Sequence, residues 1–129
     1  MIKLSKFETL DLPADYSYIA PDGSEIRLLP TMKGGGLCHV TLLPFAVSKA
    51  VSHKSVEEIW YFIQGKGQVW RKNGTKNEIV EVKSGTSITI PPQTSFQFKN
   101  TGNQPLIFLD VTMPPWPGPQ EATEVKGRW

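Results

Sequence analysis

The chain has 129 residues, about the size of one domain and too short to give two domains a sizeable core each. Hydrophobic residues make up 39 % of it, which excludes a disordered chain, while Gly 11 and Pro 11 favour many turns over a helical bundle. The net charge of +2 is too small for the basic face that nucleic-acid phosphates require, so no nucleic-acid partner is expected.

The N-terminal region carries weaker strand signals than the rest of the chain. Ile2–Leu12 alternates enough to form a strand, but its charged residues exclude a secretory signal. No stretch is long enough to span a bilayer, so we expect a cytoplasmic protein with no membrane partner. Further along, the sequence predicts a strand at Glu25–Leu29, after a turn at Pro21–Gly23, and a flexible joint at Gly34–Gly36.

From Cys38 onward the chain breaks into short β-rich runs at close spacing, which is typical of a sandwich or barrel. The Asn73-Gly74 pair between two of them predicts a tight hairpin, because both residues tolerate positive φ angles. No long helical period is present, so the fold class is all-β. The predicted strands are Cys38–Leu43, Ile59–Ile63, Gly67–Arg71, Glu78–Lys83, Thr86–Ile90, Thr94–Lys99 and Leu106–Met113.

The C-terminal tail and the single cysteine complete this outline. The prolines of Pro114–Pro119 cannot donate ladder hydrogen bonds, so this segment is expected to run extended over the surface. Cys38 excludes a disulfide within the chain and a cysteine-based zinc site, and we interpret it as a small buried residue.

Two stretches carry spaced residues that match known paired motifs. In the first, His53, Glu58 and Gly65 fit H-x-H-x-x-x-x-E followed after six residues by Gly, with Val51 at the first His position and Phe45 at an earlier Gly position. The second motif is G-x-x-x-x-x-P-x-G-x-x-H-x-x-x-N, which Gly85, Pro91 and Asn100 match. Gln93 replaces its second Gly, and Phe96 replaces its His.

These stretches resemble the two motifs of the cupin superfamily. The resemblance implies a double-stranded β-helix (jelly-roll) barrel over about residues 37–113, with N-terminal strands in 1–36, a Pro-rich tail in 114–129, and one domain over 1–129. Val56–Tyr61 and Thr112–Gly118 are also similar to stretches of uncharacterised small bacterial cupins.

The family's metal site uses three His and one Glu, and the resemblance leaves only His53 and Glu58 of that set. Because Val51 and Phe96 cannot coordinate a metal, we predict no metal cofactor. A rearranged transition-metal site is the alternative, with His39 joining His53 and Glu58, since three ligands suffice if the geometry permits. A surface or hydrogen-bonded strand histidine is the competing interpretation of His39.

Strand alternation predicts which side chains share a face. If Glu58 faces the barrel interior, as the resemblance implies, Trp60 and Phe62 do too, and the motif match places Phe96 and Phe98 there as well. These four aromatic residues are the candidate ligand-binding residues, in a pocket suited to a small organic molecule. Alternatively, they simply fill the barrel. The opposite face of the same strand carries Ile59, Tyr61 and Ile63.

Three functions follow as hypotheses. The first is small-molecule binding with metal-independent isomerase- or lyase-type chemistry, in which His53 and Glu58 act as a catalytic acid–base pair. The second is a metal-dependent dioxygenase or sugar-type isomerase that uses the His39, His53 and Glu58 set. The third is a ligand-sensing or structural dimer without catalysis.

The sequence also predicts a homodimer. The outward apolar residues of Ile59–Ile63 need a cover, and Ile2–Leu12 could be exchanged between subunits as a strand. Trp116 and Trp129, on the polar tail, are expected to act as a second clamp between subunits.

Overall fold

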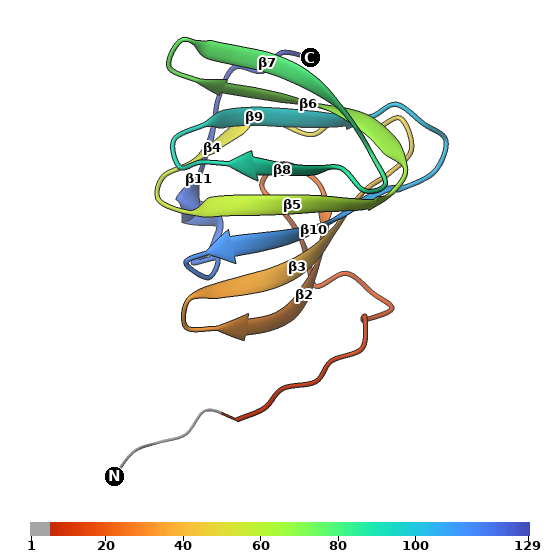
Figure 1. Ribbon diagram of the computed structural model, residues 1–129, viewed down its shortest axis with the longest axis vertical. Helices are drawn as coiled ribbons and strands as arrows, with labels where there is room; N and C mark the ends of the chain where they lie inside the picture. The colour runs from red at the N-terminus through yellow and green to blue at the C-terminus, as the bar shows by residue number, and fades with distance from the viewer. Residues whose placement is uncertain (1–5) are drawn as a thin grey trace.

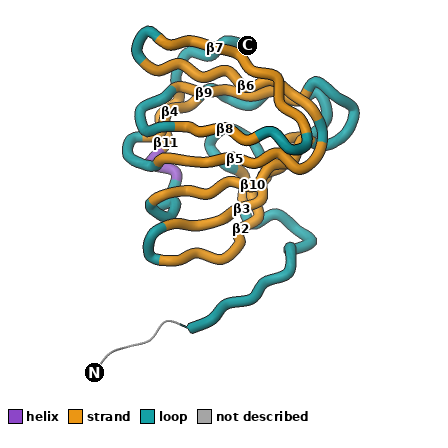
Figure 2. Tube along the Cα trace, viewed as in Figure 1, coloured by secondary structure: helices purple, strands orange, loops and turns teal. Residues whose placement is uncertain are grey.

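The computed structural model describes residues 6–129 as two antiparallel sheets that enclose a common core (Figures 1 and 2). One sheet has the order β1 (Tyr18–Ile19), β2 (Glu25–Met32), β3 (Gly35–Leu42), β10 (Leu106–Met113), β5 (Glu57–Gln64) and β8 (Ser87–Ile90). The other has the order β11 (Ala122–Glu124), β4 (Val51–His53), β9 (Ser95–Asn100), β6 (Lys66–Asn73) and β7 (Lys76–Lys83). The predicted all-β, jelly-roll fold is confirmed.

Every strand predicted from Glu25 onward has a counterpart, but the flexible joint at Gly34–Gly36 is wrong. Residues 33–34 make a turn, and Gly35 and Gly36 already belong to β3, which pairs with β2 and β10. A Cβ on Gly35 would lie 2.8 Å from the carbonyl oxygen of Thr112, so the close approach of β10 requires glycine there. The three-residue strands β4 and β11 were not predicted, because they are too short to show a period.

The hairpin between β6 and β7 is confirmed with a shift of one residue. Asn73 pairs with Lys76, so the two-residue loop consists of Gly74 and Thr75, and Gly74 takes the positive φ of 59°. The side chain of Asn73 instead donates a hydrogen bond of 3.0 Å to the hydroxyl of Thr94. Asn73 therefore ties this hairpin to the start of β9.

Phe45 and Gln93 have positive φ angles, 59° and 60°, although neither is glycine. These are the two positions where the paired motifs have glycine and this chain does not. A left-handed backbone is costly for residues with a side chain, and it persists only where the surrounding structure requires it. The loops therefore keep the shape that the motif predicts despite the substitutions.

Aromatic rings fill the centre of the barrel. Trp60 stacks on Phe108 with ring centroids 4.2 Å apart, and Phe62, Phe96 and Phe98 pack edge-on or tilted around this pair. All five are buried, so the predicted inward faces of β5 and β9 are confirmed. The outward residues of β5 are exposed, as alternation predicts: Ile59, Tyr61 and Ile63.

The C-terminal tail packs against the barrel instead of only crossing its surface. After η1 (Pro119–Glu121) it adds β11 to the edge of β4, and Gln97 of β9 accepts hydrogen bonds from the backbone N–H groups of Arg128 and Trp129. Trp129 lies under the ammonium of Lys99. The two Trp side chains expected between subunits thus have contacts within the chain, with Trp116 described below.

Two features outside the barrel frame complete the fold. Of the segment Ile2–Leu12, residues 2–5 lie outside the described residues, while 6–12 form no strand and are exposed. Residues 6–12 run away from the barrel in Figure 1. Within residues 6–129, no helix is long and apolar enough to cross a membrane.

Candidate functional site

A cavity of about 260 Å³ lies inside the barrel. Its walls come from β1, β2, β3, β5 and β10 of one sheet and from β4 and β9 of the other. Residues between 20 and 24 and the tail residues Pro115 and Trp116 also line it. This volume is near the lower end for small-molecule sites, so the cavity suits a small ligand.

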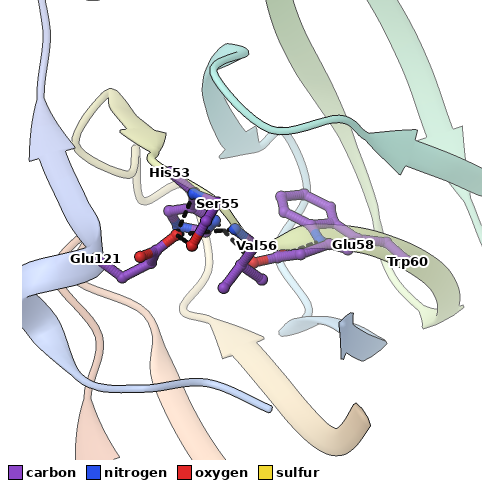
Figure 3. A network of polar contacts seen from close by, with 6 residues as sticks. All are labelled: His53, Ser55, Val56, Glu58, Trp60 and Glu121. Atoms are coloured by element: carbon purple, nitrogen blue, oxygen red, sulfur yellow. Dashed lines mark hydrogen bonds and ion pairs between the residues drawn. The ribbon is translucent and has the colours of Figure 1, made fainter. Parts of the chain in front are cut away.

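His53 and Glu58 meet in the wall of this cavity. Nδ1 of His53, at the end of β4, lies 2.9 Å from Oε2 of Glu58 on β5, and both side chains are buried. The other carboxylate oxygen, Oε1, accepts a hydrogen bond of 2.7 Å from Nε1 of Trp60 (Figure 3). The structure brings together the two residues that the sequence analysis paired, whereas the contact of Glu58 with the Trp60 indole was not predicted.

Asp110 is the site residue that sequence reasoning missed. It lies on β10 opposite both Cys38 and Trp60, is only 7 % exposed, and lines the cavity. Its Oδ1 atom has no hydrogen-bond partner among the described residues. The signal was available, because Asp110 alternates with Phe108 and so faces inward, and it is the single charged residue of Leu106–Met113.

The two buried carboxyl groups have opposite pKa shifts. Burial, the negative charge of Glu58 and a hydrogen bond to Glu58 raise the pKa of Asp110 well above its ordinary value. Burial also acts to raise the pKa of Glu58, but hydrogen bonds from His53, Asp110 and Trp60 outweigh it and lower that pKa. The pair therefore shares one proton, with Asp110 as the carboxyl group that holds it and Glu58 as the carboxylate.

Three further ionisable groups line the same cavity. Asp22 accepts hydrogen bonds from the N–H and the hydroxyl of Ser24, and desolvation raises its pKa despite them. Burial, with nearby negative charge, raises the pKa of Tyr18 to about 12 and raises that of the Cys38 thiol. Cys38 is half-buried in the cavity wall, so its interpretation as a small core residue was incomplete.

The four predicted ligand-binding aromatics divide into two pairs. Trp60 and Phe96 line the cavity, whereas Phe62 and Phe98 are fully buried away from it and pack in the core. Phe62 and Phe98 therefore do not border this cavity. Alternation identifies an inward face but not which part of that face borders a cavity.

His39 does not join His53 and Glu58. It lies on β3 between Cys38 and Val40, which line the cavity, so its side chain points to the other face of the sheet. There it is buried near Arg27, and burial followed by that positive charge lowers its pKa. The described residues contain no group of three His, Cys, Asp or Glu side chains that could hold a metal, so the rearranged His39 site is wrong.

The metal that the motifs imply does not fit the residues that replace its ligands. Val51 and Phe96 are both buried, and they pair directly across β4 and β9. The Phe96 ring packs edge-on against His53 with ring centroids 5.1 Å apart, so apolar groups occupy the space where two imidazoles would be needed. Both oxygens of Glu58 already have partners.

Hydrogen bonds hold the C-terminal tail beside the site. The buried carboxylate of Glu121 accepts hydrogen bonds from the N–H and hydroxyl of Ser55 and from the N–H of Val56 (Figure 3). Burial acts to raise the pKa of Glu121, but these bonds lower it. The same tail places Trp116 against His53, with ring centroids 4.9 Å apart, so this side chain is part of the site and not a free clamp.

Residues 38–112 match the family model of the cupin domain, which is more than half of the chain. The chain belongs to the cupin family. This cupin is 38 % identical over 113 residues to an uncharacterised protein of Methanocaldococcus jannaschii, an alignment that covers 84 % of this chain and 86 % of that protein.

Solved cupin structures share the fold at lower identity. A protein of Klebsiella pneumoniae with a double-stranded β-helix domain has a TM-score of 0.67 at 18 % identity, covering 85 % of this chain and 92 % of that one. KdgF from Halomonas has a TM-score of 0.65 at 19 % identity, covering 78 % and 87 %. The oxalate decarboxylase of Lactobacillus farciminis has a TM-score of 0.69 at 21 % identity, but this chain spans only 31 % of that one.

Proposed function

We propose that this cupin binds a small organic molecule in its cavity and moves a proton on it without a metal. The observation that carries this is the contact of 2.9 Å between Nδ1 of His53 and Glu58, in a cavity wall that also contains the protonated Asp110. Metal-free acid–base chemistry needs a base and an acid side by side, and these groups supply both.

The roles follow from the proton positions. A carboxylate beside Nδ1 favours the tautomer with the proton on that nitrogen, which leaves Nε2 of His53 as the base. Glu58 is a weak base, because its donors lower its pKa, so it orients and balances the charge of His53. Asp110 is a neutral carboxylic acid, which can donate a hydrogen bond or a proton.

These groups suit a substrate with a hydrogen on the carbon next to a carbonyl. His53 takes that proton, and the electron pair of the C–H bond moves toward the carbonyl oxygen. Asp110 then shifts its hydrogen bond from Glu58 to that oxygen as negative charge develops. Return of the proton to a different carbon or face gives an isomer or epimer. Expulsion of a leaving group from the neighbouring carbon gives a lyase reaction instead.

Hydrogen–deuterium exchange tests this function without knowledge of the substrate. Small α-hydroxy ketones, α-amino ketones, aldoses and lactones are incubated with EDTA-treated protein in D₂O and followed by proton NMR. We expect exchange of the α-hydrogen of at least one class, lost by about 100-fold or more in His53→Gln. Glu57→Gln is the matched control, since Glu57 precedes Glu58 but is exposed on the outer face of β5.

The other outcomes point to the other two functions. Exchange that requires an added divalent metal would support a metal-dependent enzyme. No exchange with any class, or exchange that persists in His53→Gln, would contradict the proposed chemistry and favour a ligand-sensing or structural role.

A further inference from the structure

The charged groups that line the cavity are of one sign, apart from one imidazole. Asp22, Glu58 and Asp110 contribute three carboxyl groups, and no Lys or Arg of the described residues lines the cavity. His53 is the only basic side chain there, and its Nδ1 is already 2.9 Å from Glu58. A bound carboxylate or phosphate would therefore meet carboxyl groups without a free positive partner.

Asp110 gives a second, independent indication of what the cavity takes. Its side chain is 93 % buried, since 7 % is exposed, and its Oδ1 has no hydrogen-bond partner among the described residues. Buried polar atoms are nearly always paired in folded proteins. Because the Asp110 carboxyl group also lines the cavity, a ligand that donates a hydrogen bond there would supply a partner.

Aromatic rings form much of the remaining wall. Trp116, Trp60, Phe96 and Phe108 line the cavity together with Tyr18. The face of an aromatic ring attracts a cation by its quadrupole, most strongly where water is excluded. Where such a ring turns its face to the cavity, it favours the same sign of charge on the ligand as the carboxyl groups do.

We propose that the cavity takes a small organic cation whose protonated amine donates a hydrogen bond to the carboxyl group of Asp110. The inference rests on the small-molecule binding in the proposed function and adds the charge class of the ligand. The cavity of about 260 Å³ limits the ligand to roughly the size of one substituted ring.

Calorimetry with three matched probes tests the charge class. Benzylamine, which is protonated at pH 7, benzyl alcohol and benzoate present one ring with positive, neutral and negative substituents. We expect wild-type protein to bind benzylamine at least about tenfold more tightly than benzoate, a difference of about 1.4 kcal/mol, with benzyl alcohol between them.

Variants assign the effect to Asp110. Asp110→Asn keeps the shape and removes the carboxyl group, so we expect it to reduce the preference for benzylamine at least about tenfold. Glu57→Gln removes an exposed carboxylate and should leave the preference unchanged. The proposal would be overturned by equal affinities for the three probes, by tighter binding of benzoate, or by no binding of benzylamine at millimolar concentration. This comparison needs only the wild-type protein.

The outcome separates this inference from the proposed function. A preference for benzylamine without any His53-dependent exchange would sustain the ligand class and contradict the catalytic role. Exchange on neutral or anionic carbonyl compounds without a preference for benzylamine would sustain the catalytic role and contradict the ligand class.

Discussion

Phe96 holds the cavity wall and the core together, so its truncation has a predictable cost. The side chain is 1 % exposed, and its ring packs edge-on against His53 at 5.1 Å and against Trp60 at 5.4 Å. Truncation of a buried Phe to Ala typically costs 3–5 kcal/mol of unfolding free energy. One side of this ring already borders a cavity, so fewer contacts are lost and we expect about 3 kcal/mol for Phe96→Ala.

Urea denaturation measures this loss. With a slope near 1.5 kcal/mol per molar urea, the midpoint should fall by about 2 M relative to wild type. Phe7→Ala is the control, because Phe7 is fully exposed and its truncation should stay within about 0.5 kcal/mol. A loss below about 1 kcal/mol for Phe96→Ala would place its ring outside the core and refute the packing argument.

Three further changes have expected outcomes. Glu121→Ala should lower the free energy of unfolding by about 1–3 kcal/mol at pH 7. Because folding lowers the pKa of Glu121, this loss should shrink as the pH falls below 4.5. An equal loss at pH 3 would contradict the role of the Glu121 carboxylate as a hydrogen-bond acceptor. Elemental analysis should find well under one transition metal ion per wild-type chain purified without added metal. The double variant Val51→His and Phe96→His should bind Ni²⁺, because it restores two imidazole ligands. Stoichiometric metal in the wild-type protein would refute the prediction of no metal site. Light scattering at micromolar concentration should show a homodimer, not a 14.4 kDa monomer, because an apolar strand face stays exposed on a single chain: Ile59, Tyr61 and Ile63.

The sequence predicted the barrel well because β5, β9 and β10 have clear alternation. Glu58, Trp60 and Phe62 face inward as the period of two requires. The same rule applied to β10 identifies Asp110, since its inward neighbour Phe108 is unmistakably a core residue. Asp110 was not predicted because it lies outside both motifs, the second of which ends at Asn100.

Other parts of the site could not be predicted from local pattern. The pairing of β11 with β4, and with it the contact of Trp116 with His53, joins segments that are far apart in the chain. Likewise, no periodicity separates Phe96 at the cavity from Phe98 in the core, because both lie on the inward face of β9. Whether an inward side chain borders the cavity or lies in the closed core depends on the spacing of the two sheets at that point.

The apolar replacements at the ligand positions also explain the protonation of Asp110. Val51 and Phe96 supply no ligands, and as buried apolar groups they help to keep water from the cavity that contains Glu58 and Asp110. Exclusion of water is the largest cause of the raised pKa of Asp110. The same substitutions that remove the metal site therefore favour a neutral carboxylic acid beside a carboxylate.

This link gives a last prediction. Phe96→Ala should admit water next to Asp110, so the pKa of its carboxyl should fall toward the ordinary value, while Phe98→Ala, which alters the core away from the cavity, should leave it raised. Titration of the Asp110 carboxyl carbon by NMR measures both variants. An unchanged pKa in Phe96→Ala would mean that the charge of Glu58, and not the dry apolar wall, keeps Asp110 protonated.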